Sequence, residues 1–268
     1  MLYYKKIEKD PTRDWVVFIH GAGGSSAVWF KQIKEYSEHF NLLLIDLRGH
    51  GKSAEVANQY DQRDYSFESI TQDVLDTLDS IGIREAHFIG VSLGTIIVRK
   101  MAEMDKLRVK SMILVGAITY LNLKSRFWVG LGRMFRNIMP YMWLYRLFAF
   151  VIMPARSHRE SRNLFVREAQ KLCQREFLRW FKLTSQLTSL FNELNNKESN
   201  IPTLYVMGEE DHMFLEPIRN LIKQVKNSAL YVVEKCGHVV NVEKPQVFNE
   251  VSISFLHEPS RFLQGLYK

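Results

Sequence analysis

Three residue types that can together perform nucleophilic chemistry on an acyl group occur in the order serine, aspartate, histidine at Ser92, Asp211 and His238. Ser92 is the centre of residues 90–94 (GVSLG), which follow a strand-like run and precede a helix-like one. The two glycines suit a tight strand-to-helix turn, where a side chain would collide with neighbouring backbone. Such a turn, a nucleophile elbow, presents the serine hydroxyl for attack.

The glycine-rich residues 20–25 (HGAGGS) are a second candidate part of this site. They follow residues 15–19 (WVVFI), a continuous apolar run typical of a strand buried on both faces. A loop of this composition can bring backbone N–H groups close to a ligand, although a plain glycine turn explains it equally well. A dinucleotide-binding fingerprint is excluded, because it would need glycine where the chain has Ser26.

The aspartate and the histidine also follow strand-like runs. Residues 201–207 (IPTLYVM) lead into 208–211 (GEED), and residues 229–233 (ALYVV) lead towards His238. In an open parallel sheet, ligands and reactive groups gather beyond the carboxyl ends of the strands. We therefore expect Ser92, Asp211 and His238 to meet at one edge of a sheet.

On these motifs the chain resembles the α/β-hydrolase superfamily, in its branch of esterases, lipases and C–C hydrolases. The resemblance extends over nearly the whole chain and implies an α/β fold with a mostly parallel sheet flanked by helices. It also implies a helical cap inserted before the strand that bears the acid. The matching segments are residues 20–23 (HGAG), 46–53 (DLRGHGKS), 90–94 (GVSLG), 208–211 (GEED) with Pro217, and 237–238 (GH).

The resemblance implies a role for each reactive residue. Ser92 would be the nucleophile, His238 the base and Asp211 the acid that orients it, in the chain order of this fold. Backbone N–H groups of Ala22 and Leu93 would form an oxyanion hole. His20 would support the glycine loop. No metal or organic cofactor is expected, and the predicted substrate-binding residues are Gly21, Gly23, Trp128 and Val239.

Nearby residues compete for two of these roles. Glu209 and Glu210 precede Asp211, but the resemblance places the acid at the fourth position of the turn. Some relatives carry the acid after the strand that follows the elbow helix, and residues 116–122 there contain no carboxylate. His212 competes with His238, yet adjacent side chains rarely orient each other. The remaining histidines are expected to be structural or exposed: His39, His50, His87, His158 and His257.

Residues 49–53 (GHGKS) end like a phosphate-binding loop. The full pattern would need glycine at position 46, which is Asp46. We therefore interpret these residues as the loop after the second core strand, with no nucleotide role.

Composition is that of a globular chain, with 268 residues, 46% hydrophobic and 24% charged. Cys173 and Cys236 are too few for a disulfide scaffold and suit a reducing compartment. We expect Cys236 to pack beneath His238. Residues 1–7 (MLYYKKI) contain no apolar stretch long enough for a signal peptide, so the expected location is the cytoplasm.

Residues 120–197 are predicted to form the helical cap, between core segments 1–119 and 198–268. From position 121 to 200 there are fourteen Lys or Arg against five Asp or Glu. The apolar run 138–154 is interrupted by Arg146 and is too short to cross a membrane. Two interpretations remain open: a helix with its apolar side on the core and its arginines in solvent, or an apolar substrate tunnel whose basic rim attracts an anionic acyl substrate or, weakly, a membrane surface.

Three functions are compatible with these features. The first is hydrolysis of a carboxylic ester of an apolar or aromatic acyl group. The second uses the same residues for C–C bond hydrolysis, thioester hydrolysis, peptide cleavage or a lyase step. The third is a non-catalytic ligand receptor. No nucleic-acid-binding module is recognisable. The sequence does not define the physiological substrate, the oligomeric state or the mobility of the cap.

Overall fold

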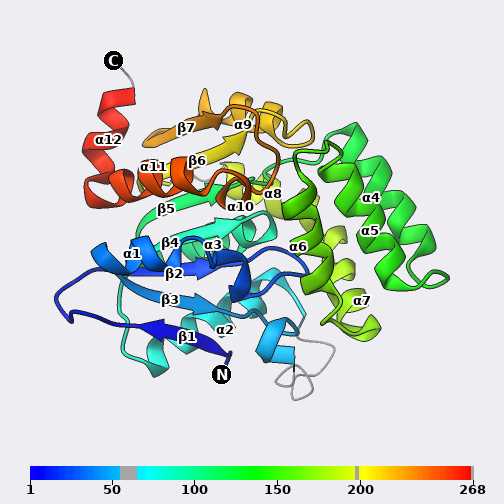
Figure 1. Ribbon diagram of the computed structural model, residues 1–268, viewed down its shortest axis with the longest axis horizontal. Helices are drawn as coiled ribbons and strands as arrows, with labels where there is room; N and C mark the ends of the chain where they lie inside the picture. The colour runs from blue at the N-terminus through cyan, green and yellow to red at the C-terminus, as the bar shows by residue number, and fades with distance from the viewer. Residues whose placement is uncertain (55–64, 197–198, 267–268) are drawn as a thin grey trace.

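The strands form one seven-stranded sheet in the order β1-β3-β2-β4-β5-β6-β7 (Figure 1). The computed structural model describes residues 1–54, 65–196 and 199–266. β1 runs antiparallel to β3, and every other neighbouring pair is parallel. The predicted mostly parallel α/β sheet is therefore confirmed. The strands are β1 Tyr4–Ile7, β2 Trp15–Ile19, β3 Asn41–Ile45, β4 Ala86–Val91, β5 Val109–Val115, β6 Thr203–Gly208 and β7 Ser228–Val233.

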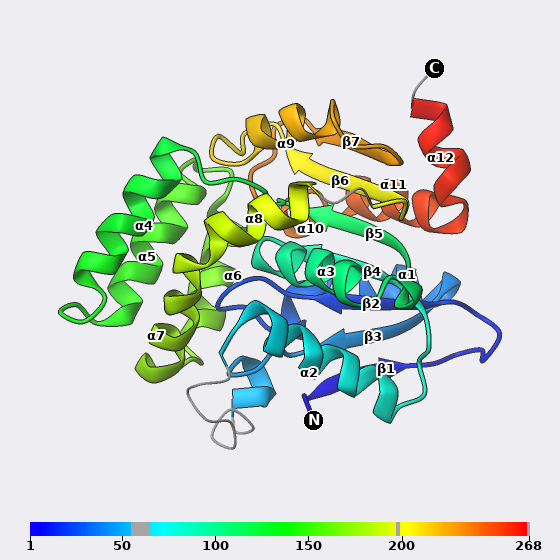
Figure 2. The ribbon, with the colours of Figure 1, turned by 180° about the vertical axis from the view of Figure 1, so that it is seen from behind.

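Helices cover both faces of this sheet, which explains why the central strands are continuously apolar. Side chains of β2 alternate between the two sides: Val17 and Ile19 join one apolar cluster, and Val16 and Phe18 join the other. α2, α3, α8 and α9 pack on the first side, and α1, α10, α11 and α12 on the second (Figures 1 and 2). The core helices are α1 Ile33–His39, α2 Phe67–Ser80, α3 Leu93–Met104, α9 Leu215–Ile222, α10 Val240–Glu243, α11 Pro245–His257 and α12 Pro259–Leu266.

The predicted strands are present, with small differences at their ends. β4 continues to Val91, so that the turn at Ser92 follows the strand at once. β1 is a strand that the sequence pattern did not indicate. Two of its four residues are exposed lysines, Lys5 and Lys6, and charged side chains are common on a strand at the edge of a sheet.

Within the described residues, five α-helices lie between β5 and β6, near the end of the sheet to which the parallel strands point (Figure 1). We call α4–α7 the cap helices. α8 falls inside the predicted segment 120–197 but packs on the core, with Leu187, Leu190 and Phe191 in the first apolar cluster. The predicted boundary at 197–198 lies outside the described residues. The five helices are α4 Leu123–Phe135, α5 Tyr141–Ile152, α6 Arg159–Ala169, α7 Gln174–Lys182 and α8 Leu187–Asn196.

α5 only partly follows the expected division between an apolar inner side and a basic outer side. Leu144, Tyr145 and Ala149 are buried. Trp143 and Phe150, however, are exposed on the same side as Arg146. The solvent side of this helix therefore mixes aromatic and basic residues, because the cap helices are too few to cover every apolar side chain. Within the described residues, no helix is long and apolar enough to span a membrane.

Candidate active site

Ser92 occupies a strained turn between β4 and α3. Its backbone has φ +53° and ψ −119°, an unusual conformation for a residue with a side chain. The turn is tight enough to require glycine on both sides. A Cβ on Gly90 would lie 2.6 Å from the carbonyl oxygen of Gly94, and one on Gly94 would lie 2.3 Å from that of Ile19. The GVSLG pattern thus reflects close backbone packing, and it leaves Ser92 half-buried at the end of β4.

Ser92 begins a series of hydrogen bonds through the two other predicted residues. His238 Nε2 lies 2.9 Å from Ser92 Oγ, and His238 Nδ1 lies 2.7 Å from Asp211 Oδ2. A neutral imidazole with its proton on Nδ1 donates to the carboxylate and accepts from the serine hydroxyl. The histidine and the aspartate are buried. The arrangement can therefore take a proton from Ser92 and stabilise the resulting imidazolium.

The competing acids and the competing histidine make other contacts. Asp211 Oδ1 accepts a hydrogen bond of 3.1 Å from the Phe214 N–H, which fixes its carboxylate at the start of α9. Glu209 accepts from the Lys235 N–H at 3.0 Å, and Glu210 binds His158. His212 is exposed. Of the three candidate acids, Asp211 is the one that hydrogen-bonds His238 within the described residues.

The glycine loop lies directly against the elbow. A Cβ on Gly21 would be 3.1 Å from Ser92 Cβ and 3.8 Å from the Leu93 nitrogen, so glycine allows the loop to approach this closely. Among the described residues, the N–H groups of Ala22 and Leu93 donate to no protein acceptor. Leu93 directly follows Ser92 and Ala22 directly follows Gly21, so these two donors are the candidates for stabilising an oxyanion on an acyl group attacked by Ser92.

Two buried histidines hold this loop. His20 Nε2 accepts from the Leu47 N–H at 2.9 Å, and its Nδ1 lies 2.7 Å from the Gly21 carbonyl oxygen. His50 Nε2 accepts from the Gly23 N–H at 2.9 Å. Burial lowers the pKa of His20 and lowers that of His50 to about 3. Both rings therefore stay neutral and keep one acceptor nitrogen, which His50 uses for the loop and His20 for the Leu47 N–H.

Apolar side chains of the elbow helix and of the cap pack on the first apolar cluster. Leu93 and Trp128 are partly buried and belong to the same cluster, although Trp128 comes from α4. Ile118, Leu121 and Ile152 join them there. Val239, directly after His238, packs on the opposite apolar cluster. The predicted substrate residues are thus divided between Gly21 and Gly23 at the loop, Trp128 on the cap side and Val239 behind the histidine.

The cap contacts this site through residues that sequence reasoning missed. The Tyr145 ring of α5 lies against Gly23, where a Cβ would be 2.7 Å from a ring carbon. His158, between α5 and α6, lies 2.7 Å from Glu210 and packs on Gly237. These contacts join segments far apart in the chain, and no local pattern indicates them.

Cys236 is buried beneath this region and lies 3.8 Å from a Glu243 oxygen. Burial raises the pKa of its thiol, so the thiol stays protonated and is a poor nucleophile. Within the part of the chain that the structure describes, no group of three or more His, Cys, Asp or Glu could hold a metal ion.

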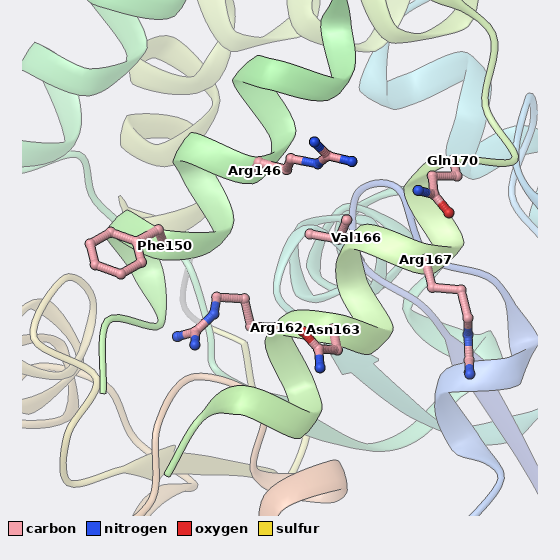
Figure 3. A pocket seen from close by; sticks show the side chains of 7 residues that line it. All are labelled: Arg146, Phe150, Arg162, Asn163, Val166, Arg167 and Gln170. Atoms are coloured by element: carbon pink, nitrogen blue, oxygen red, sulfur yellow. The ribbon is translucent and has the colours of Figure 1, made fainter. Parts of the chain in front are cut away.

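An open groove of about 420 Å³ between α5 and α6 is a separate feature (Figure 3). Its lining includes none of Ser92, Asp211 and His238. Arg146 extends from α5 and Arg162 and Arg167 from α6, so the groove is basic (Figure 3).

Comparison with known proteins places the chain in a family. A family model described as the alpha/beta hydrolase fold matches residues 14–245. RutD of Stutzerimonas stutzeri, whose name proposes a carbamate hydrolase, is 26% identical over 258 residues, covering 93% of this chain and 94% of that protein. The 3-oxoadipate enol-lactonase 1 of Acinetobacter baylyi is 23% identical over 245 residues, covering 90% and 88% of the two chains.

A solved structure has the same fold. A hydrolase from Oleispira antarctica superposes with a TM-score of 0.82 at 17% identity, covering 95% of this chain and 94% of that one. The chain therefore belongs to the α/β-hydrolase family, as the resemblance of its motifs implied. The two relatives named above are, by their names, a putative carbamate hydrolase and an enol-lactonase, which supports an enzyme that cleaves bonds with water.

Proposed function

We propose that the protein is a serine hydrolase that cleaves carboxylic esters of apolar or aromatic acyl groups through an acyl-enzyme on Ser92. The observation that carries this proposal is the continuous series from Ser92 through His238 to Asp211, with separations of 2.9 and 2.7 Å. These separations are hydrogen-bonding distances, and the order of groups is nucleophile, base and orienting acid.

The first step joins the acyl carbon to Ser92 Oγ. As that bond forms, His238 Nε2 takes the hydroxyl proton, and Asp211 holds the proton on Nδ1 and stabilises the imidazolium. The N–H groups of Leu93 and Ala22 donate to the oxyanion of the tetrahedral intermediate. Collapse of the intermediate breaks the ester C–O bond, and His238 gives its proton to the departing alcohol.

The second step returns the enzyme to its starting state. Water attacks the acyl carbon while His238 takes one of its protons. The Ser92 C–O bond then breaks, the serine recovers its proton from His238, and the acid leaves. Every step uses only groups of this chain and water.

Two observations support an ester with an apolar acyl group. Leu93, directly after Ser92, packs on the first apolar cluster, and Ile118 and Trp128 pack on the same cluster. The relative from Acinetobacter baylyi, of which the match covers 88%, is an enol-lactonase by name, and a lactone is an internal ester. The cap side chains then set the size of the acyl group that reaches the serine.

The proposal is tested with p-nitrophenyl esters of increasing acyl length, using the wild-type protein and Ser92→Ala. We expect turnover in the wild type and a loss of about 10⁶-fold in kcat for the variant. Ser189→Ala is the matched control, since Ser189 is exposed on α8, and it should retain full turnover. Wild-type activity that survives in Ser92→Ala would exclude Ser92 as the nucleophile.

A folded wild-type protein that cleaves none of these esters would instead favour the other chemistries of the same residues. Thioesters, peptides and C–C substrates, and a lyase assay, then separate these alternatives. Binding of an apolar acid without turnover of any of them would favour a receptor.

A further inference from the structure

Large apolar side chains are exposed mainly on one part of the molecule. Of the eleven that are exposed within the described residues, seven lie between positions 120 and 150, on or beside α4 and α5. The two helices lie at the outer edge of the molecule in both views, away from α12 (Figures 1 and 2). The seven are Tyr120, Leu123, Phe127, Met134, Ile138, Trp143 and Phe150.

On α4 these side chains form a single stripe. Leu123, Phe127 and Met134 are spaced by four and seven residues, which places them on one face of a helix, and Ile138 follows just beyond its end. Phe127 is 63% exposed and Leu123 is 84% exposed. The opposite face is already used: a Cβ on Gly132 would meet the rings of Phe148 and Phe181. The exposed stripe is therefore available to another molecule.

Basic residues flank the apolar stripe. At 100° per residue, Arg126 and Arg133 lie on one side of it and Lys124 on the other, and all three are exposed. The sequence contains no Asp or Glu from position 106 to 159, whereas seven Lys or Arg occur between 120 and 159. The surface thus combines an apolar centre with cationic edges and has no anion of its own.

The groove between α5 and α6 is a separate basic surface, because Arg146 and Phe150 lie on the face of α5 opposite Phe148, which packs towards α4. Arg146 and Phe150 line it from α5, and Arg162 and Arg167 line it from α6 (Figure 3). The Arg162 guanidinium lies over the Phe150 ring at 5.7 Å. Arg167 is 69% exposed. Cations and an aromatic ring therefore face solvent together here as well.

We propose that α4 docks the protein on the surface of an anionic lipid bilayer. Leu123, Phe127 and Met134 would enter the boundary between headgroups and acyl chains, and Arg126 and Arg133 would contact lipid phosphates. A helix with an apolar face and a basic polar face binds bilayers in this orientation, lying in the interface. The proposal does not depend on the chemistry at Ser92.

Charge argues for a bilayer against two other occupants. A second copy placed symmetrically on this face would set its arginines against those of the first copy, which costs free energy. A nucleic acid would pair with the cations but would leave the apolar stripe between them without a partner. An anionic bilayer satisfies both components at once.

The test is co-sedimentation of the full chain with vesicles of phosphatidylcholine and phosphatidylglycerol at 3:1, beside pure phosphatidylcholine vesicles. We expect binding to the anionic vesicles that weakens as salt is raised. Arg126→Gln with Arg133→Gln should weaken it by about 25-fold, at about fivefold per arginine. Phe127→Ser should weaken it at least about tenfold.

Leu107→Ser is the matched control. Leu107 is 87% exposed but lies in the short 3₁₀ helix Lys106–Arg108, away from α4 and α5. This variant should bind vesicles like the wild type, and so should Ser92→Ala, which separates docking from catalysis. Thermal unfolding of each variant checks that it is folded.

The proposal would be overturned by no binding to anionic vesicles, by equal loss of binding in Leu107→Ser and Phe127→Ser, or by a vesicle-free dimer that Phe127→Ser dissociates. The last result would assign the surface to a second copy. Binding of an RNA oligonucleotide that competes fully with vesicles and is unaffected by Phe127→Ser would assign it to nucleic acid.

Discussion

The carboxyl edge of the sheet and the outer cap helix α4 differ in which kind of side chain they bury. At the sheet edge, Asp211 and His238 are buried and each hydrogen-bonds a neighbour. On α4, Leu123 and Phe127 are large and apolar, yet both are exposed. Polar side chains are thus buried at the sheet edge, and large apolar side chains are exposed on α4.

The contrast separates two tasks. Burying an ionisable pair costs free energy unless its members are hydrogen-bonded. At the sheet edge, the hydrogen bonds of Asp211 and His238 offset this cost. Exposing an apolar stripe has no benefit for the isolated chain, so α4 is best explained by a partner. We therefore assign chemistry to the sheet edge and docking to the outer cap.

The largest expected effect is at the sheet edge. Asp211→Asn should lower kcat on the best ester by about 10⁴-fold, because the imidazole loses the partner that fixes its tautomer. Glu209→Gln is the control, because Glu209 accepts a hydrogen bond from the Lys235 N–H and is not the partner of His238. This variant should change kcat little. Steady-state kinetics of both variants make the measurement, and equal losses would contradict the assignment of the acid.

Glycine substitutions compare the two regions directly. Gly94→Ala should destabilise the protein by about 1–3 kcal/mol or more, because its Cβ would lie 2.3 Å from the Ile19 carbonyl oxygen. Gly130→Ala on α4 should stabilise it by about 1 kcal/mol, since no atom lies within 4 Å of that Cβ and alanine favours a helix. Urea denaturation measures both, and changes of the same sign would remove the contrast.

Acid should weaken the core through its buried histidines. Burial lowers the pKa of His50 to about 3 and that of His87 to about 4, from an ordinary value of 6.5. Below pH 6.5 the unfolded chain binds protons that the folded chain does not, so the free energy of unfolding falls as the pH drops towards 4.

His50→Gln checks this dependence, since its amide oxygen can still accept from the Gly23 N–H but does not titrate. The variant should lose about 1–2 kcal/mol less than the wild type between pH 7 and pH 5 in urea denaturation. An unchanged slope would mean that His50 does not contribute.

The smallest effect is expected on the inner side of the cap. Trp128→Ala should raise KM for long-chain esters about fivefold and leave KM for the acetyl ester unchanged, because Trp128 is partly buried in the cluster that includes Leu93. KM across the ester series measures it. Equal changes for short and long esters would show that Trp128 acts through folding.

Local pattern was sufficient for the residues of the sheet edge. Ser92, Asp211 and His238 each follow a strand, and parallel strands bring such residues together whatever lies between them in the sequence. The need for glycine at positions 90 and 94 is also visible in the local sequence, because the turn itself requires it.

Pattern was insufficient where the contact is between distant segments. His158 and Glu210 are 52 residues apart, and Tyr145 meets Gly23 across the cap, so neither pair leaves a local signal. The edge strand β1 carries no alternation to detect, because Tyr4 and Ile7 are half-buried and the two lysines between them are exposed. The exposure of apolar residues on α4 depends on which helices pack against it. The periodicity of the α4 sequence does not define those neighbours.

The most direct measurement of the central claim is the site of covalent modification by a fluorophosphonate, read by peptide mass mapping. We predict one adduct, on Ser92, formed rapidly in the wild type and in His212→Ala and very slowly in His238→Ala. An adduct on another residue, or ester turnover that survives complete labelling of Ser92, would contradict the account.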